Sequence, residues 1–248
     1  MTPGSLALVG SGEYLPAMAE VEGMLLAGRP ARYVQIPTAA APEGERSLRR
    51  WLDLGAEQAR RLGVAQIPVV VRDRREADSA DLAALVRGAG LIYLSGGSPG
   101  YLARTLRGTL VWEAVVAAWQ AGAALAGCSA GAIALTGWVP AMRALHREPD
   151  PGLGLLPHLR VLPHFDRMLG WVPDLLARAV LHQPAGTTVL GIDEDTAIVD
   201  LTGAGATWQV HGRQRAWTLA DGPRRGHPAG STLSTPLLVG SRDLAGPA

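Results

Sequence analysis

The stretch that decides the fold reads LAGCSAGAIAL and spans residues 125–135. It places the pattern G-x-S-x-G between an apolar strand and an apolar helix, which is the context in which this pattern forms a nucleophile elbow. The chain turns sharply there, so the neighbours of the serine must be small, as Gly127, Ala130 and Gly131 are. The helix N-terminus that follows favours an oxyanion. We therefore predict that Ser129 is a nucleophile; the alternative is a small-residue turn without chemistry.

Short apolar runs alternate with helical patterns over the first 136 residues. Strands are expected at residues 6–9, 31–36, 66–71, 90–94 and 123–128. An amphipathic helix lies between the second and third, and another begins at Asp78 or Ser79. This alternation predicts a parallel sheet with helices on both faces, whose reactive groups gather at the carboxyl ends of the strands.

The regular alternation of expected strands and helices ends after residue 136. A loop rich in Pro and Gly precedes a strand at 159–162 and a helix at 172–182, and shorter runs follow at 188–193, 196–201, 207–210 and 215–219. The short runs predict an antiparallel extension of the sheet. We expect a single three-layer α/β domain over residues 1–248, with a mostly parallel sheet and the last thirty or so residues loose.

Composition limits the class of protein. The 248 residues are 48% hydrophobic and 18% charged, which permits a sizeable core. The single cysteine, Cys128, rules out an intrachain disulfide and fits the reducing cytoplasm; we expect it to be buried and structural. The chain has no lysine, which excludes a P-loop lysine, a Schiff-base lysine and a Ser–Lys dyad.

Charge and hydropathy argue against two kinds of partner. A net charge of +1 gives no long-range attraction to nucleic acid or to an anionic membrane. No run of eighteen apolar residues lacks charge or punctuation, so we expect no membrane span, and the N-terminal residues do not read as a signal peptide.

A glycine pair follows the fourth expected strand, where residues 92–100 read IYLSGGSPG. One glycine N–H is expected to join the N–H of Ala130 in an oxyanion hole. The alternatives are a plain turn or a phosphate-binding loop. A nucleotide-binding role is disfavoured, because Gly10-x-Gly12 continues into Glu13-Tyr14 and does not complete G-x-G-x-x-G.

A catalytic serine needs a general base, and the chain has six histidines: His146, His158, His164, His182, His211 and His227. We choose His164, because it follows the strand at 159–162 at the end where the architecture gathers reactive groups. His158 precedes the same strand and is expected at the opposite end.

Three consecutive carboxylates offer an acid to orient that histidine, in residues 190–197, which read LGIDEDTA. Alternation places Asp193 and Asp195 on one side and Glu194 on the other, and spacing does not choose between them. Asp166 is a poorly placed competitor, two residues from His164. The alternative is that the three carboxylates form a solvent-exposed acidic turn with no catalytic role.

These motifs, in this order, resemble the peptidase E and cyanophycinase family. The resemblance covers roughly residues 5–200 and rests on the glycine pair, residues 127–132, residues 164–166 and residues 191–197, with Gly10-x-Gly12-Glu13 and residues 36–39 also similar. It implies a class I glutamine-amidotransferase-like fold and a homodimer. It also implies a triad of Ser129, His164 and Glu194, with the N–H groups of Gly97 and Ala130 as the oxyanion hole.

The predicted function is a serine exopeptidase, dipeptidase or carboxypeptidase-like, that cleaves short peptides through an acyl-enzyme without metal or cofactor. Candidate substrate contacts are Ser98 and the arginines Arg143, Arg147 and Arg167, which are able to bind a terminal carboxylate. The alternatives are an esterase or amidase and a non-catalytic binding scaffold. Ser98-Pro99 stands where cyanophycinase-like members carry Asp or Asn followed by Gln, so cyanophycin degradation is not expected.

Overall fold

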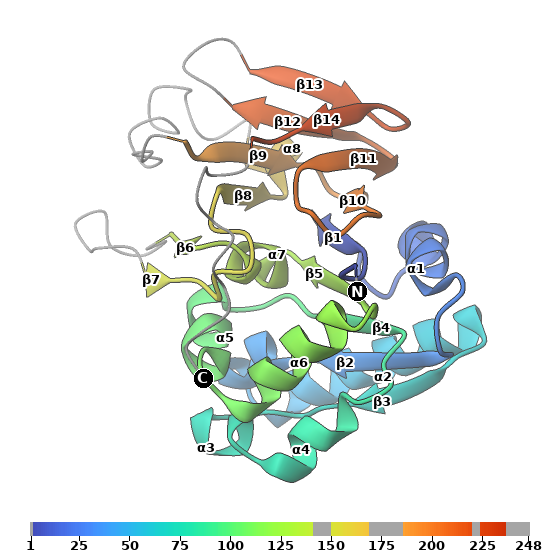
Figure 1. Ribbon diagram of the computed structural model, residues 1–248, viewed down its shortest axis with the longest axis vertical. Helices are drawn as coiled ribbons and strands as arrows, with labels where there is room; N and C mark the ends of the chain where they lie inside the picture. Colours follow the sequence, from blue (N-terminus) through green and yellow to red (C-terminus); the bar gives the residue numbers. More distant parts are fainter. Residues whose placement is uncertain (1, 141–149, 169–185, 220–223, 237–248) are drawn as a thin grey trace.

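The computed structural model describes residues 2–140, 150–168, 186–219 and 224–236. Its centre is an eight-stranded sheet with the order β14-β11-β10-β1-β5-β4-β2-β3 (Figure 1). Five neighbouring strands of this sheet are parallel, as predicted: β1 (Leu6–Val9), β2 (Arg32–Ile36), β3 (Ala65–Pro68), β4 (Leu91–Leu94) and β5 (Ala124–Cys128). The third strand is shorter than the expected run at 66–71 and ends at Pro68.

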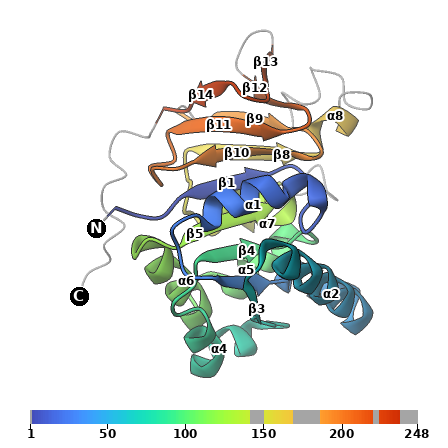
Figure 2. The same cartoon turned by 90° about the vertical axis from the view of Figure 1, so that its right-hand side faces the viewer.

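Side chains alternate across this sheet and build a core on each face. Leu6 and Leu8 of β1 join the larger buried cluster, whereas Ala7 and Val9 join the cluster on the other face. The second cluster contains residues of α1 (Ala19–Leu26) and α2 (Glu45–Leu62). The larger one contains residues of α3 (Arg74–Ala77), α5 (Pro99–Leu106), α6 (Leu110–Gln120) and α7 (Ala130–Leu135). The layers can be followed in Figure 2.

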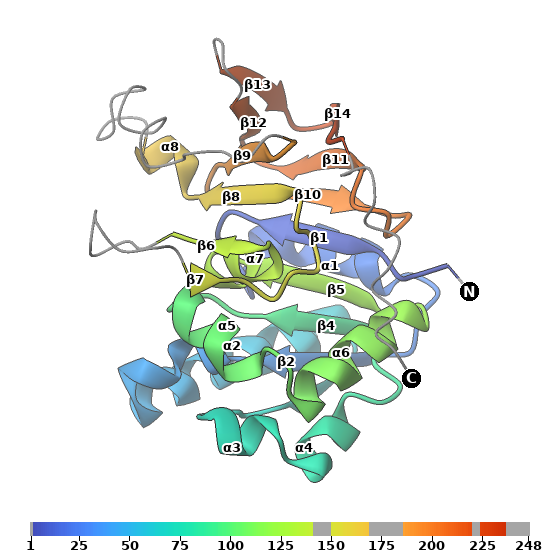
Figure 3. The ribbon, with the colours of Figure 1, turned by 60° about the vertical axis from the view of Figure 1, so that its left-hand side comes forward.

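The antiparallel extension is present on the far side of β1. There β10 (Thr196–Asp200) pairs with β1, β11 (Thr207–Gly212) pairs with β10, and β14 (Thr232–Ser234) pairs with β11. The other late strands form a separate four-stranded sheet that the sequence did not reveal (Figure 3): β8 (Leu159–Pro163), β9 (Thr188–Ile192), β12 (Arg215–Leu219) and β13 (Arg225–Pro228). β10 pairs with β1 in the larger sheet, whereas β8 and β9 pair with each other in the separate one.

Short elements complete the chain. They are the 3-10 helices η1 (Pro16–Met18) and η2 (Thr38–Glu43), α4 (Ala80–Leu85), α8 (Phe165–Met168), and the paired strands β6 (Trp138–Val139) and β7 (Asp150–Pro151). The side chain of Ser79 caps α4 by accepting from the N–H of Leu82, whereas Asp78 ends α3.

Two further sequence expectations concern the C-terminal part of the chain. The helix at 172–182 lies outside the described residues. Within the last thirty residues, expected to be loose, β13 and β14 are paired with β12 and β11. Across the part of the chain that the structure describes, no helix combines the length and apolar character needed to span a bilayer.

Candidate active site

Ser129 occupies a strained turn between β5 and α7. Its backbone has φ 49° and ψ −107°, a region that costs a residue other than glycine about 1–3 kcal/mol. The turn is held by a hydrogen bond from the Ser129 N–H to the carbonyl of Val9, 2.9 Å. A Cβ added to Gly127 would lie 2.6 Å from the carbonyl carbon of Gly131, and one added to Gly131 would lie 2.3 Å from the Leu94 oxygen. Small residues are therefore required here, as the sequence predicted.

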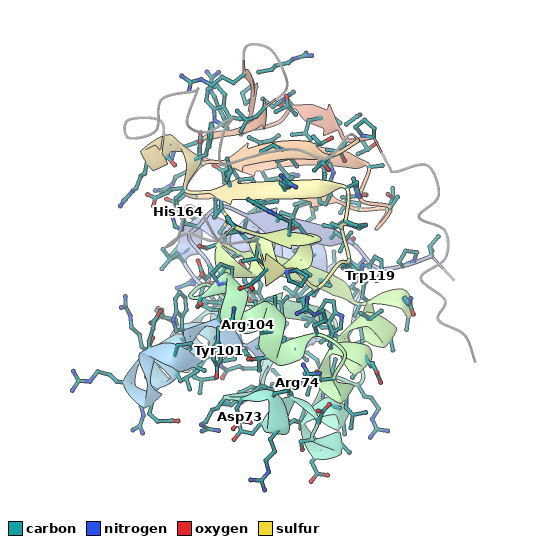
Figure 4. The ribbon with its side chains drawn as sticks, turned by 90° about the vertical axis from the view of Figure 1, so that its left-hand side faces the viewer. Asp73, Arg74, Tyr101, Arg104, Trp119 and His164 are labelled. Atoms are coloured by element: carbon teal, nitrogen blue, oxygen red, sulfur yellow. The ribbon has the colours of Figure 1, made fainter. Side chains whose placement is uncertain are left out.

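The imidazole of His164 lies beside the serine hydroxyl. His164 directly follows β8, as Figure 4 shows, and its backbone also has a positive φ of 52°. Its Nε2 lies 3.0 Å from Oγ of Ser129. Because β8 and β9 are parallel and Pro163 is opposite Ile192, the residues that follow the two strands lie side by side. This register brings the acidic turn to the imidazole.

Glu194 is the member of the acidic turn that meets His164, with Oε1 2.9 Å from Nδ1. Asp193 instead accepts hydrogen bonds from the Trp217 indole at 2.9 Å and from the backbone N–H of Arg215, and burial raises the pKa of its carboxyl. Asp195 forms an ion pair with Arg213, 3.3 Å. The three carboxylates thus have three different sets of partners. They lie in the turn between β9 and β10, so the strand alternation expected from the sequence does not apply to them.

Two further groups hold Glu194 in place. Nε of Arg167 lies 2.9 Å from Oε2 of Glu194, so each carboxylate oxygen has its own partner. Oδ1 of Asp166 accepts the backbone N–H of Glu194 at 2.9 Å. Asp166 therefore supports the acidic turn and does not compete with Glu194 for the imidazole.

The glycine pair lies next to Ser129. A Cβ built on Gly96 would be 3.6 Å from Cβ of Ser129. Gly97 is exposed and has φ 133°, and a Cβ there would lie 2.4 Å from the Ala39 oxygen, so only glycine fits. Ala130 is the first residue of α7, and its N–H has no partner within that helix. Gly96 and the N-terminus of α7 thus both adjoin Ser129.

The remaining candidates are dispersed. Ser98 is half-buried, precedes α5 and donates its N–H to Ala39. Arg143 and Arg147 lie outside the described residues, as do His146 and His182. His158 bonds to the carbonyl of Gly205, and His227 to the hydroxyl of Thr218.

Cys128 is buried, as expected, and its thiol donates to Oε2 of Glu13 at 2.8 Å. Burial and the neighbouring carboxylate raise the pKa of this thiol, which keeps it protonated and unreactive. Within the described ranges, no group of three or more His, Cys, Asp or Glu side chains is arranged to hold a metal ion.

Sequence reasoning missed the contribution of the segment after β1. The hydroxyl of Ser11 accepts the backbone N–H of Asp195 at 3.2 Å, and Glu13 accepts the N–H of Gly96 at 3.0 Å. The carboxyl end of β1 adjoins that of β5, which was the available signal. From the sequence, these glycines indicate an incomplete nucleotide motif and a part of the family resemblance, and no contact of this segment with the site is predicted.

Comparison with known proteins agrees with this geometry. Residues 6–206 match the sequence profile of Peptidase family S51. The crystal structure of a peptidase from an acI-B1 actinobacterium is similar, with 42% identity over 94% of this chain and 97% of that chain, and a TM-score of 0.86. A candidate peptidase E from Listeria monocytogenes EGD-e shares the fold, with 16% identity, coverage of 91% and 98%, and a TM-score of 0.54. A comparison with curated proteins finds no match. The chain therefore belongs to Peptidase family S51, the peptidase E family, and is a serine peptidase with a class I glutamine-amidotransferase-like fold.

Proposed function

We propose that this peptidase removes residues from short peptides through an acyl-enzyme, with Ser129 as nucleophile, His164 as base and Glu194 as the orienting acid. One observation carries the proposal: an unbroken chain of contacts from the Ser129 hydroxyl to His164 Nε2, 3.0 Å, and from His164 Nδ1 to Glu194, 2.9 Å. Nucleophile, base and orienting group in hydrogen-bonding sequence are the geometric signature of an activated serine.

The direction of proton transfer follows from the partners of the imidazole. Nδ1 faces a carboxylate and so carries the ring proton, which leaves the lone pair of Nε2 to accept the proton of Ser129. The alkoxide attacks the peptide carbonyl, and the N–H groups of Gly97 and Ala130 receive the oxyanion. The imidazolium, stabilised by Glu194, then protonates the leaving amine, and water releases the acyl group by the reverse sequence.

The preference for short peptides rests on the ordered motifs shared with peptidase E. An exopeptidase must recognise a charged peptide terminus, and Ser98, Arg143, Arg147 and Arg167 remain candidates for that contact. A single-domain homodimer working in the cytoplasm is part of the same proposal.

The test is a library of free dipeptides and tripeptides with N-blocked and C-blocked counterparts, read by mass spectrometry, with Ser129→Ala as control. We expect free dipeptides or tripeptides to be cleaved and one type of block to abolish cleavage, which identifies the recognised end. Turnover of esters without peptides would favour the acyl hydrolase alternative. Absence of both turnover and Ser129 labelling by a fluorophosphonate would favour the binding scaffold.

A further inference from the structure

A buried carboxylate lies directly beneath the candidate site. Glu13 follows β1 and is only 8% exposed. Its Oε1 accepts the N–H of Gly96 at 3.0 Å, and its Oε2 accepts the thiol hydrogen of Cys128 at 2.8 Å. Gly96 immediately precedes Gly97, and Cys128 immediately precedes Ser129. Glu13 therefore joins the two segments that supply the oxyanion donor and the nucleophile.

The ion pairs among the described residues do not include Glu13. A carboxyl group taken out of water without a cation is costly to bury, and a neutral side chain of similar size would pack there at lower cost. The two hydrogen bonds of Glu13, to the glycine pair and to the end of β5, are interactions that such a neutral apolar side chain would not make. Both bonds are made to residues directly adjacent to Gly97 and Ser129.

We propose that Glu13 is a positioning residue for peptide hydrolysis: it holds the N–H of Gly96 toward the interior, so that the next N–H, that of Gly97, faces the oxyanion beside Ser129. This inference rests on the proposed function. It assigns Glu13 no contact with substrate, and its effect on catalysis is transmitted through the peptide plane of the glycine pair.

Glu13 is packed closely enough against Gly96 that a displacement of its carboxylate would displace the glycine pair. A Cβ on Gly96 would lie 2.6 Å from Oε1 of Glu13, so the carboxylate is packed directly against the backbone that it orients. The next residue, Tyr14, has a positive φ of 64°, and its hydroxyl lies 2.6 Å from that of Ser95. The segment is also joined to the acidic turn through Ser11. Residues 11–14 thus contact the glycine pair, the elbow and the acidic turn at Asp195.

Three replacements separate positioning from simple support of the fold. Glu13→Gln keeps an acceptor for Gly96, Glu13→Leu has similar size and no acceptor, and Glu13→Asp withdraws the carboxylate by one methylene group. Because a misplacement of about 1 Å in a catalytic group costs about 10²-fold, we expect kcat to fall about 30-fold in Glu13→Leu and about tenfold in Glu13→Asp. KM should stay within about twofold of wild type in each, because Glu13 does not contact substrate.

The conservative variant Glu13→Gln and a control at Cys128 are expected to retain activity. Glu13→Gln should keep kcat within about threefold of wild type, and the matched control Cys128→Ser, which retains a donor for Oε2, should do the same. The second-order rate constant for fluorophosphonate labelling of Ser129 should fall in parallel with kcat in every variant, since the phosphonyl oxygen uses the same donors. A variant that merely unfolds in part loses labelled sites and keeps this rate constant.

The result that overturns the inference is a labelling constant and kcat within threefold of wild type in Glu13→Leu, or in Glu13→Asp if the leucine variant does not fold. Failure of the proposed function looks different, because wild-type protein would then neither turn over peptides nor label at Ser129.

Discussion

Two glutamates in this fold, Glu194 and Glu22, are held in opposite ways. Glu194 lies at the carboxyl edge of the strands, with a side chain 23% exposed and ring and guanidinium nitrogens 2.9 Å from its two oxygens. Glu22 lies on α1 beneath the sheet, 1% exposed, and receives hydrogen bonds from the Tyr33 hydroxyl and the Gln58 amide. Burial raises the pKa of Glu22 to about 7.

The difference shows what makes a carboxylate usable in catalysis. Glu194 has cationic or ionisable partners and contact with water, so its charge is available to stabilise an imidazolium. Glu22 has neutral donors for one oxygen, while Oε1 has no hydrogen-bond partner among the described residues, so the charged form of Glu22 is disfavoured. The first arrangement suits the proposed role of Glu194 in catalysis and the second affects stability, and each can be tested by an isosteric change.

The largest effect is expected at the nucleophile. Replacement Ser129→Ala removes the attacking oxygen and should lower kcat by about 10⁵–10⁶-fold, leaving only the rate that the oxyanion donors and binding supply. The measurement is peptide turnover by mass spectrometry, with circular dichroism to show an unchanged fold. Retention of more than about one percent of the activity would contradict the assignment of Ser129.

The next effect is expected at the acid. Glu194→Gln preserves size but removes the charge that stabilises the imidazolium and fixes its tautomer, so kcat should fall about 10³–10⁴-fold. The matched control is Asp195→Asn in the same turn, which touches Arg213 and not the imidazole; it should keep kcat within about fivefold. Equal losses in the two variants would mean that the whole turn, and not one carboxylate, supports His164.

Much of this site could be predicted from the chain, because its parts are local. The elbow was predictable since the strand, the small residues and the helix are contiguous, and His164 was predictable since parallel strands direct their carboxyl ends to one edge. The choice of Glu194 needed the family resemblance, because it depends on the register of β8 and β9. The contacts of Glu13 join residues more than eighty positions apart, which no local pattern encodes. The separate sheet depends on which late strands pair with each other, and the pattern within each strand does not specify that pairing.

The residues with strained backbone conformations lie in or next to the candidate site. Four described residues other than glycine have positive φ: Tyr14, Ser129, His164 and Asp195. Each is a site residue or directly follows one in sequence. Conformations of this kind cost about 1–3 kcal/mol and persist where the surroundings enforce them, and sequence alone does not reveal them.

The buried glutamate predicts how stability depends on pH. The folded protein keeps the Glu22 proton up to a pH of about 7, whereas the unfolded chain releases it near 4.5. The native state therefore binds more protons between these values, so the free energy of unfolding from this group falls as pH rises through that window, by about 3 kcal/mol, and levels off above it.

Glu22→Gln should abolish this decline, because the amide is neutral at every pH. Denaturant unfolding from pH 4.5 to 8 measures the slope, and Glu20→Gln, an exposed position on the same helix, is the matched control that should follow wild type. Identical slopes in Glu22→Gln and wild type would show that Glu22 releases its proton near the ordinary pKa, and the contrast with Glu194 would be lost.

The smallest effect, and the one that sharpens the comparison most, concerns the arginine beside the acid. The Arg167 side chain is 74% exposed, so its attraction to Glu194 is weakened by water and screened by salt. If Arg167 steadies Glu194, Arg167→Ala should lower kcat about two- to threefold at low ionic strength, leave KM unchanged, and match wild type in 1 M salt. Arg213→Ala is the paired control, since Arg213 is similarly exposed, 71%, but pairs with Asp195.

If Arg167 instead binds the peptide terminus, KM should rise and kcat should stay unchanged, because binding energy common to substrate and transition state is then lost. The split between kcat and KM therefore decides whether this guanidinium belongs to the catalytic acid or to the substrate.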